Sequence, residues 1–121
     1  NGGCPYPCHF RASTGELSEV RIEAYPLGIR PDTRYPVEEI QLEPHDYIIF
    51  CSDGIVEAEN PAGDQFGYDQ TEETIRKGCA EELSPEQLID RIFSTVEEFA
   101  DSTPQGDDRT VVVLKIDPSI A

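Results

Sequence analysis

Two continuous apolar runs, each bordered by acidic residues, place the strongest constraint on how this chain folds. The first run, residues 47–51, leads into Asp53. The second run, residues 111–114, follows shortly after Asp107 and Asp108. Short apolar runs rich in β-branched and aromatic residues are typical of strands that are buried on both faces. We therefore expect both runs to be central strands of a sheet.

The acidic residues lie at matching ends of these predicted strands. Asp53 follows the end of one strand, and Asp107 precedes the start of the other. If the strands are antiparallel neighbours, both carboxylates reach the same edge of the sheet, where their oxygens would suit a hard divalent ion such as Mg²⁺ or Mn²⁺. The alternative is that Asp53 begins an ordinary turn and that Asp107 and Asp108 lie in a solvated loop.

The charge of the chain excludes several classes of partner. Its 121 residues correspond to one domain or part of one, and 9 Lys and Arg against 25 Asp and Glu give a net charge of −16. Nucleic acid and anionic membrane surfaces need clustered basic residues, so neither is expected as a partner. No apolar stretch approaches the ~20 residues of a membrane span, so no membrane insertion is expected. The start at Asn1 and the absence of Met indicate a piece of a longer polypeptide.

The four cysteines are Cys4, Cys8, Cys51 and Cys79. Cys4 and Cys8, with His9 beside them, suggest a zinc site. Structural zinc sites usually bring a second closely spaced pair of ligands, which this sequence lacks. We therefore expect free, reduced thiols in a cytosolic protein.

The predicted elements follow one another as several strands, then helices, then a last strand, an order typical of an α+β fold. A helix is expected from a capping box at Asp69 and Glu72 to about Lys77, with Gly78 as its stop. A second helix has Ser84 as its cap and an apolar stripe that extends to residue 100. Strands are expected over residues 6–12, 16–23, 35–42 and 110–116, besides the run that ends at Asp53. The order predicts one α+β unit over residues 1–121, with a largely antiparallel sheet and no internal boundary.

Several short motifs, taken in order, resemble the SpoIIE-like (stage II sporulation protein E-type) phosphatases of the PPM class, which are metal-dependent serine/threonine phosphatases. Each motif is weak alone, but together, in the order of the family from residue 1 to about residue 116, they are specific. The motifs are NGGCP (1–5), PLG (26–28), LEPHD (42–46), SDGIVEA (52–58), NPAG (60–63), FG (66–67) and QGDDRT (105–110).

The resemblance implies a fold and a chemistry. The fold would be part of the PPM β-sandwich, with α-β-β-α layers, and the reaction would be hydrolysis of phosphoserine or phosphothreonine on a protein. Two Mn²⁺ or Mg²⁺ ions would activate the attacking water. Asp53 and Asp107 match the family's metal ligands, and Asp108 matches a weaker or outer group. The implied substrate is a phosphorylated regulator of bacterial sigma-factor or stress signalling, and an upstream sensor or regulatory domain is expected.

The chain also departs from the family pattern. Cys4 stands where His is frequent, Gly106 replaces an Asp, and Arg109 replaces an apolar residue and is either a phosphate contact or an ion-pair partner. The Asp-Gly pair that bridges the metals lies upstream in the family, so this chain resembles the C-terminal half of the domain and is expected to be inactive alone. Two alternatives remain: a non-catalytic module that binds a phosphoprotein, and an acidic domain that binds a divalent ion for stability only.

Overall fold

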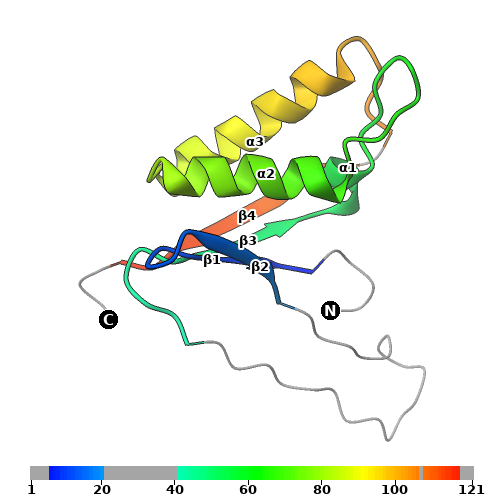
Figure 1. Ribbon diagram of the computed structural model, residues 1–121. Coiled ribbons are helices and arrows are strands. Elements are labelled where there is room, and N and C mark those ends of the chain that lie inside the picture. Colours follow the sequence, from blue (N-terminus) through cyan, green and yellow to red (C-terminus); the bar gives the residue numbers. More distant parts are fainter. Residues whose placement is uncertain (1–5, 21–40, 107, 118–121) are drawn as a thin grey trace, which may run out of the picture.

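One four-stranded antiparallel sheet and three helices make up the computed structural model, which describes residues 6–20, 41–106 and 108–117. The strand order is β2-β1-β3-β4. Figure 1 shows α2 and α3 lying across one face of this sheet. The elements are β1 (Cys8–Arg11), β2 (Glu16–Glu19), β3 (Tyr47–Cys51), α1 (Asp53–Val56), α2 (Gly67–Ala80), α3 (Pro85–Ala100) and β4 (Val111–Lys115). The predicted α+β class with an antiparallel sheet is confirmed.

The first two strands form the predicted hairpin. Arg11 pairs with Glu16, and the N–H groups of Thr14 and Gly15 both donate to the Arg11 carbonyl. Gly15 has a φ of +75°, a conformation that glycine adopts without steric cost. The strand predicted over 35–42 lies mostly outside the described residues, and its last two positions, 41 and 42, are not in a strand.

The core lies between the sheet and the two long helices. Alternate strand residues such as Ile49 and Val113 face α2 and α3, where they pack with the apolar side of each helix. Among the residues of the other parity, Ile48 is buried, but Phe50, Val112 and Leu114 are exposed by 43%, 46% and 53%. The expectation that both runs are buried on both faces holds for residues 47–49 but is wrong for Phe50, Val112 and Leu114, because α2 and α3 cover only one face of the sheet.

Helix α2 differs from its prediction at both ends. It begins at Gly67 rather than Asp69, and no side chain caps it. It continues through Gly78, and the residue with a left-handed conformation is Glu82, with a φ of 59°, just beyond the helix. Gly78 has a packing role instead, since a Cβ added there would lie 2.5 Å from the Leu88 side chain of α3.

Helix α3 follows its prediction. Ser84 accepts a hydrogen bond from the Gln87 N–H, and the Gln87 side chain accepts one from the Ser84 N–H, so the capping box is complete. The apolar stripe is buried at Leu88, Ile92 and Val96. None of the helices in the described segments is long and apolar enough to cross a membrane.

A buried hydrogen bond between His9 and Asp46 fixes the turn before β3. His9 Nε2 lies 2.9 Å from Asp46 Oδ2, and the two side chains are 4% and 0% exposed. Asp46 also accepts hydrogen bonds from the N–H groups of Ala12 and Glu43. Burial alone would raise the pKa of Asp46, but the hydrogen bonds from His9, Ala12 and Glu43 outweigh it, and the pKa lies below its ordinary value. The carboxylate is therefore ionised, and His9 donates to it.

Candidate functional site

The two acidic segments meet where β3 ends and β4 begins. These strands are antiparallel neighbours, and the last residue of β3, Cys51, pairs with the first residue of β4, Val111. The strand direction assumed from the sequence is therefore correct. Asp53 is the first residue of α1, and Asp108 lies shortly before β4.

Ser52 joins the two segments by three hydrogen bonds. Its N–H donates to the Thr110 carbonyl over 2.9 Å, and the Thr110 N–H donates back to Ser52 Oγ over 2.9 Å. The Ser52 hydroxyl donates to the Asp108 carbonyl oxygen over 3.2 Å. These bonds extend the β3–β4 pairing past the strand ends, so that residues 52–54 and 108–110 form one unit, called the junction below.

Gly54 allows the segments to approach this closely. It is buried, and a Cβ placed on it would overlap the carbonyl oxygen of Asp108. Any other residue would push the backbone around Asp108 away. The glycine of the Ser-Asp-Gly motif is thus required by the contact between the two motifs rather than by an unusual φ.

The predicted ligands are only partly located. Asp53 is half-buried and Asp108 is exposed, whereas Asp107 lies outside the described residues. The proximity of Asp53 and Asp107 therefore stays a prediction. Within residues 6–20, 41–106 and 108–117, no group of three His, Cys, Asp or Glu side chains is arranged to hold a metal ion.

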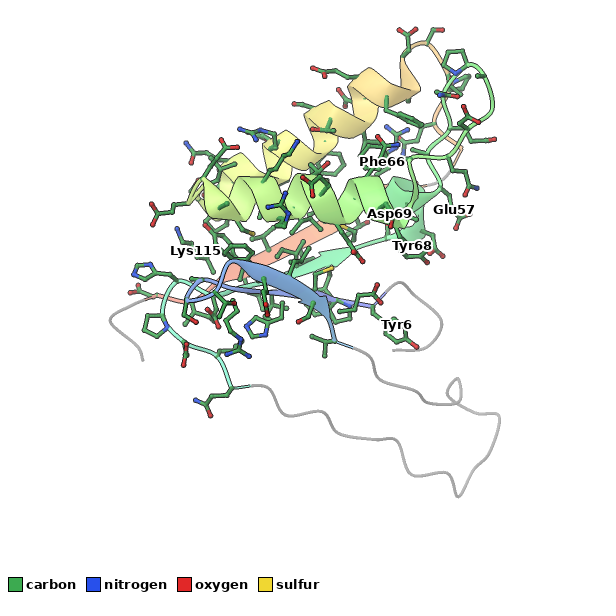
Figure 2. All side chains as sticks on the ribbon, viewed as in Figure 1. Tyr6, Glu57, Phe66, Tyr68, Asp69 and Lys115 are labelled. Atoms are coloured by element: carbon green, nitrogen blue, oxygen red, sulfur yellow. The ribbon has the colours of Figure 1, made fainter. Side chains whose placement is uncertain are left out.

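A polar pocket next to the junction was not expected from the sequence. It has a volume of about 330 Å³ and begins at Gly54, and Glu57, Glu59, Thr103 and Arg109 are among the residues that line it. Figure 2 shows Glu57 at the right-hand end of the molecule, beside α1. The sequence signals for this pocket are Glu57, within the motif around Asp53, and Arg109, which departs from the family pattern. The ion pair considered for Arg109 is absent among the described residues.

The cysteines of the described segments are not suited to nucleophilic chemistry. Cys8, Cys51 and Cys79 are free thiols, and Cys4 lies outside the described residues. Burial is the main cause that raises the pKa of each of the three thiols to about 12. They are therefore protonated at neutral pH, and a protonated thiol is a poor nucleophile and a poor metal ligand.

The same fold occurs in PP2C phosphatase domains. The SiaA-PP2C domain of Pseudomonas aeruginosa matches with a TM-score of 0.75 and 18% identity, over 93% of this chain and 44% of that chain. The PP2C phosphatase domain and regulatory-domain fragment of the cell fate determinant SpoIIE from Bacillus subtilis matches with a TM-score of 0.70 and 24% identity, over 97% of this chain and 33% of that chain. The RsbU and RsbW domains of Rv1364c from Mycobacterium tuberculosis match with a TM-score of 0.67 and 25% identity, over 98% of this chain and 32% of that chain. The fold is that of part of a PP2C-type phosphatase domain.

The sequence assigns the chain to one family among the proteins that share this fold. The sequence profile of the stage II sporulation protein E (SpoIIE) family matches residues 1–117, and the chain belongs to this family. No curated protein sequence matches the chain significantly. The chain spans less than half of the length of each of these three solved chains. This agrees with the expectation that it is part of a larger catalytic domain.

Proposed function

We propose that the chain forms the C-terminal half of a catalytic domain that hydrolyses phosphoserine or phosphothreonine on a regulatory protein. The junction is the observation that carries this proposal. It joins the Ser52-Asp53-Gly54 motif to the segment after Asp107, and those two segments hold the acids that the family uses as metal ligands. Three hydrogen bonds and a close contact at Gly54 hold these two segments together, whereas two unrelated surface loops would have no such contacts.

The Asp side chains near the junction suit Mn²⁺ or Mg²⁺ as ligands, because both ions favour carboxylate oxygens. Asp53 and Asp107 are proposed as terminal ligands, with Asp108 as a weaker or outer one. When bound, such cations screen the charge of the phosphate and lower the pKa of the attacking water. The chain has a net charge of −16, so a phosphorylated substrate requires this local positive charge.

The chain's own residues would orient the reacting groups. Ser52, which directly precedes Asp53, holds its own backbone against Thr110 and the Asp108 carbonyl, so these positions are ordered before the substrate binds. This kind of preorganisation supports catalysis because the geometry is set before the reaction begins. The remaining ligands, including the bridging Asp, are expected from the upstream part of the domain.

The biological setting is also a proposal. A phosphorylated regulator of sigma-factor or stress signalling is the substrate class that family membership favours, and a sensor or regulatory domain would control the activity. Such a phosphatase would act in the cytoplasm of a bacterium.

The test is the activity of the full-length protein that contains this chain, measured with phosphoserine peptides over a range of Mn²⁺ concentrations. Asp53→Asn and Asp107→Asn should each lower activity by orders of magnitude and weaken Mn²⁺ dependence, because Asn keeps the shape but lacks the charge. Asp108→Asn should cost about 10- to 100-fold, the usual range for groups outside the ligand shell.

Melting curves in chelator provide the control, since all three variants should unfold at nearly the wild-type temperature without metal. Full activity in Asp53→Asn would refute the proposal. If Asp108→Asn were the most damaging change, the ligand assignment would be off by one residue.

A non-catalytic phosphoprotein-binding module is the second candidate. It is favoured by the departures from the family pattern at Cys4, Gly106 and Arg109. Phosphopeptide binding by the full-length protein without turnover at any Mn²⁺ concentration would support this candidate instead.

A further inference from the structure

Two serines occupy the same position before a helix but use their hydroxyl groups differently. Ser52 precedes α1 with φ and ψ of −78° and 168°, and Ser84 precedes α3 with −66° and 163°. A serine at this position normally accepts a hydrogen bond from an N–H group in the first turn of its own helix. Ser84 does so, whereas the Ser52 side chain makes no such bond. Because the two backbones are nearly the same, the difference comes from what surrounds Ser52.

The Ser52 hydroxyl contacts the segment that leads into β4 instead of its own helix. Ser52 Oγ accepts a hydrogen bond from the Thr110 N–H over 2.9 Å and donates one to the Asp108 carbonyl over 3.2 Å. These two backbone groups lie on either side of Arg109. One side chain therefore holds the backbone of residues 108–110 against the residue that directly precedes Asp53.

The two bonds of the Ser52 hydroxyl contribute little to the stability of the fold. Asp108 and Thr110 are exposed, and Ser52 is half-buried. Where water reaches both partners, bonds to water replace a lost hydrogen bond, so its net contribution to folding is small. Water molecules bound to each group separately would still leave the two segments free to move apart. The hydroxyl therefore matters more for the relative position of the segments than for folding.

We infer that Ser52 is a positioning residue, whose hydroxyl fixes the spacing between the backbone of Asp53 and that of Asp108 and thereby sets the affinity of the site for its divalent ion. Ser52 itself does not bind the ion. It lies between the two segments that carry the proposed ligands, and the loss of such an outer partner typically costs about 10- to 100-fold in metal affinity. This inference deepens the proposed function and rests on it for the roles of Asp53 and Asp107 as ligands.

The alternative is that the Ser52 side chain only lengthens the pairing of β3 with β4. The Ser52 backbone already does this, since its N–H donates to the Thr110 carbonyl over 2.9 Å. Ser52→Ala keeps this backbone bond and removes both bonds of the hydroxyl, so it isolates the contribution of the side chain. Ser52→Thr keeps a hydroxyl on the same carbon atom and is the conservative variant.

The experiment measures Mn²⁺ binding by the full-length protein without substrate, from the electron paramagnetic resonance signal of the free ion. We expect Ser52→Ala to weaken Mn²⁺ binding by about 10-fold or more, and Ser52→Thr to bind Mn²⁺ within about 3-fold of the wild type. Ser84→Ala is the matched control, because it also removes a hydroxyl hydrogen bond before a helix. This control should lower the melting temperature in chelator without changing the affinity for Mn²⁺.

Hydrolysis of a phosphoserine peptide separates a positioning residue from a ligand. Ser52→Ala keeps every carboxylate of the chain, so excess Mn²⁺ should fill the weakened site and restore most of the activity. Asp53→Asn lacks a ligand, so the same excess should not restore its activity. At saturating Mn²⁺ the KM of Ser52→Ala for the peptide should equal that of the wild type, because the hydroxyl bonds to the chain's own backbone.

The outcomes distinguish this inference from the proposed function. Unchanged Mn²⁺ affinity in Ser52→Ala would overturn the positioning role, even if hydrolysis by the wild type is normal. An equal loss of affinity in Ser84→Ala, or a loss that Ser52→Thr does not restore, would overturn it as well. Mn²⁺ binding that depends on the Ser52 hydroxyl, with no turnover of any peptide, would support the positioning role and reject the phosphatase reaction. A wild type that binds no Mn²⁺ would reject both.

Discussion

At the scale of single residues, the junction depends on Gly54 having no side chain. In Gly54→Ala the new methyl group would overlap the Asp108 carbonyl, so the segment around Asp108 must move. We expect a loss of about 1–3 kcal/mol in the free energy of unfolding, the usual cost of overpacking. Activity of the full-length protein should fall with it. Urea unfolding and peptide hydrolysis measure the two effects.

Gly106 provides the matched control for this change. It lies in the loop between α3 and β4, as Asp108 does, and a Cβ added to it would have nothing within 4 Å. Gly106→Ala should therefore change stability by no more than about 0.5 kcal/mol, as is usual for surface positions. Equal stability of Gly54→Ala and Gly106→Ala would show that the junction tolerates separation.

A second effect at this scale is the pH dependence caused by Asp46. Its folded-state pKa is lowered, so the carboxylate stabilises the protein above the unfolded-state pKa of about 3.9, and this contribution is lost as the pH falls through the folded-state pKa. Asp46→Asn should cost about 1–3 kcal/mol at neutral pH, because an amide cannot accept all three hydrogen bonds.

The measurement is urea unfolding of both proteins from pH 7 to pH 2. The difference between wild type and Asp46→Asn should be largest near neutrality and should shrink in strong acid, where the wild-type carboxyl is also protonated. A difference that stays constant over this range would mean that Asp46 acts through its shape and not through its charge.

At the scale of elements, α3 should depend on its cap. Ser84→Ala removes the acceptor for the Gln87 N–H and should reduce stability by about 0.5–2 kcal/mol. Ser94→Ala, at an exposed position within the same helix, should have little effect or stabilise slightly, since Ala has the higher helix propensity. Thermal unfolding of the two variants tests this, and similar melting temperatures would contradict it.

The contrast between α2 and α3 explains what the sequence could predict about elements. The signal for α3 is local, with a cap, a proline and a stripe, and the helix forms as predicted. The start of α2 has no side-chain cap, and its passage through Gly78 depends on Leu88 of the neighbouring helix. A prediction from neighbouring residues in the sequence cannot include a contact with a different helix. The prediction that β4 is buried on both faces fails for the same reason, because the composition of a strand does not show which of its faces is covered.

The candidate site was predictable only in part. Strand direction and the order of the motifs predict Asp53 and Asp107 at one end of β3 and β4. The antiparallel pairing of those strands agrees with the predicted direction, whereas Asp107 itself lies outside the described residues. The pocket formed by Glu57, Glu59 and Arg109 was not predictable, because it depends on how two loops meet in space.

At the scale of the whole molecule, the exposed apolar face of β3 and β4 is a surface expected to be covered in the full-length protein. Family membership implies a β-sandwich, in which a second sheet would pack on Phe50, Val112 and Leu114. Leu114→Gln in the full-length protein should then cost about 2–5 kcal/mol, as for a core residue. Tyr68→Gln is the control, because its exposure here, 56%, is close to the 53% of Leu114. Equal, small effects in urea unfolding would mean that no second sheet packs there.

Within the described sheet, β4 is an edge strand, and this position has a kinetic consequence. An edge strand is paired on one side only, so local opening begins there more readily than in the middle of a sheet. At the end of β4 that carries the acidic segment, the Ser52 N–H donates to the Thr110 carbonyl and the Thr110 N–H donates to Ser52 Oγ, so this end of β4 is held to the end of β3. Amide exchange at these two positions would therefore report how often the reactive end of the sheet comes apart, and ligands that act there would slow this exchange before they change the stability of the rest of the fold.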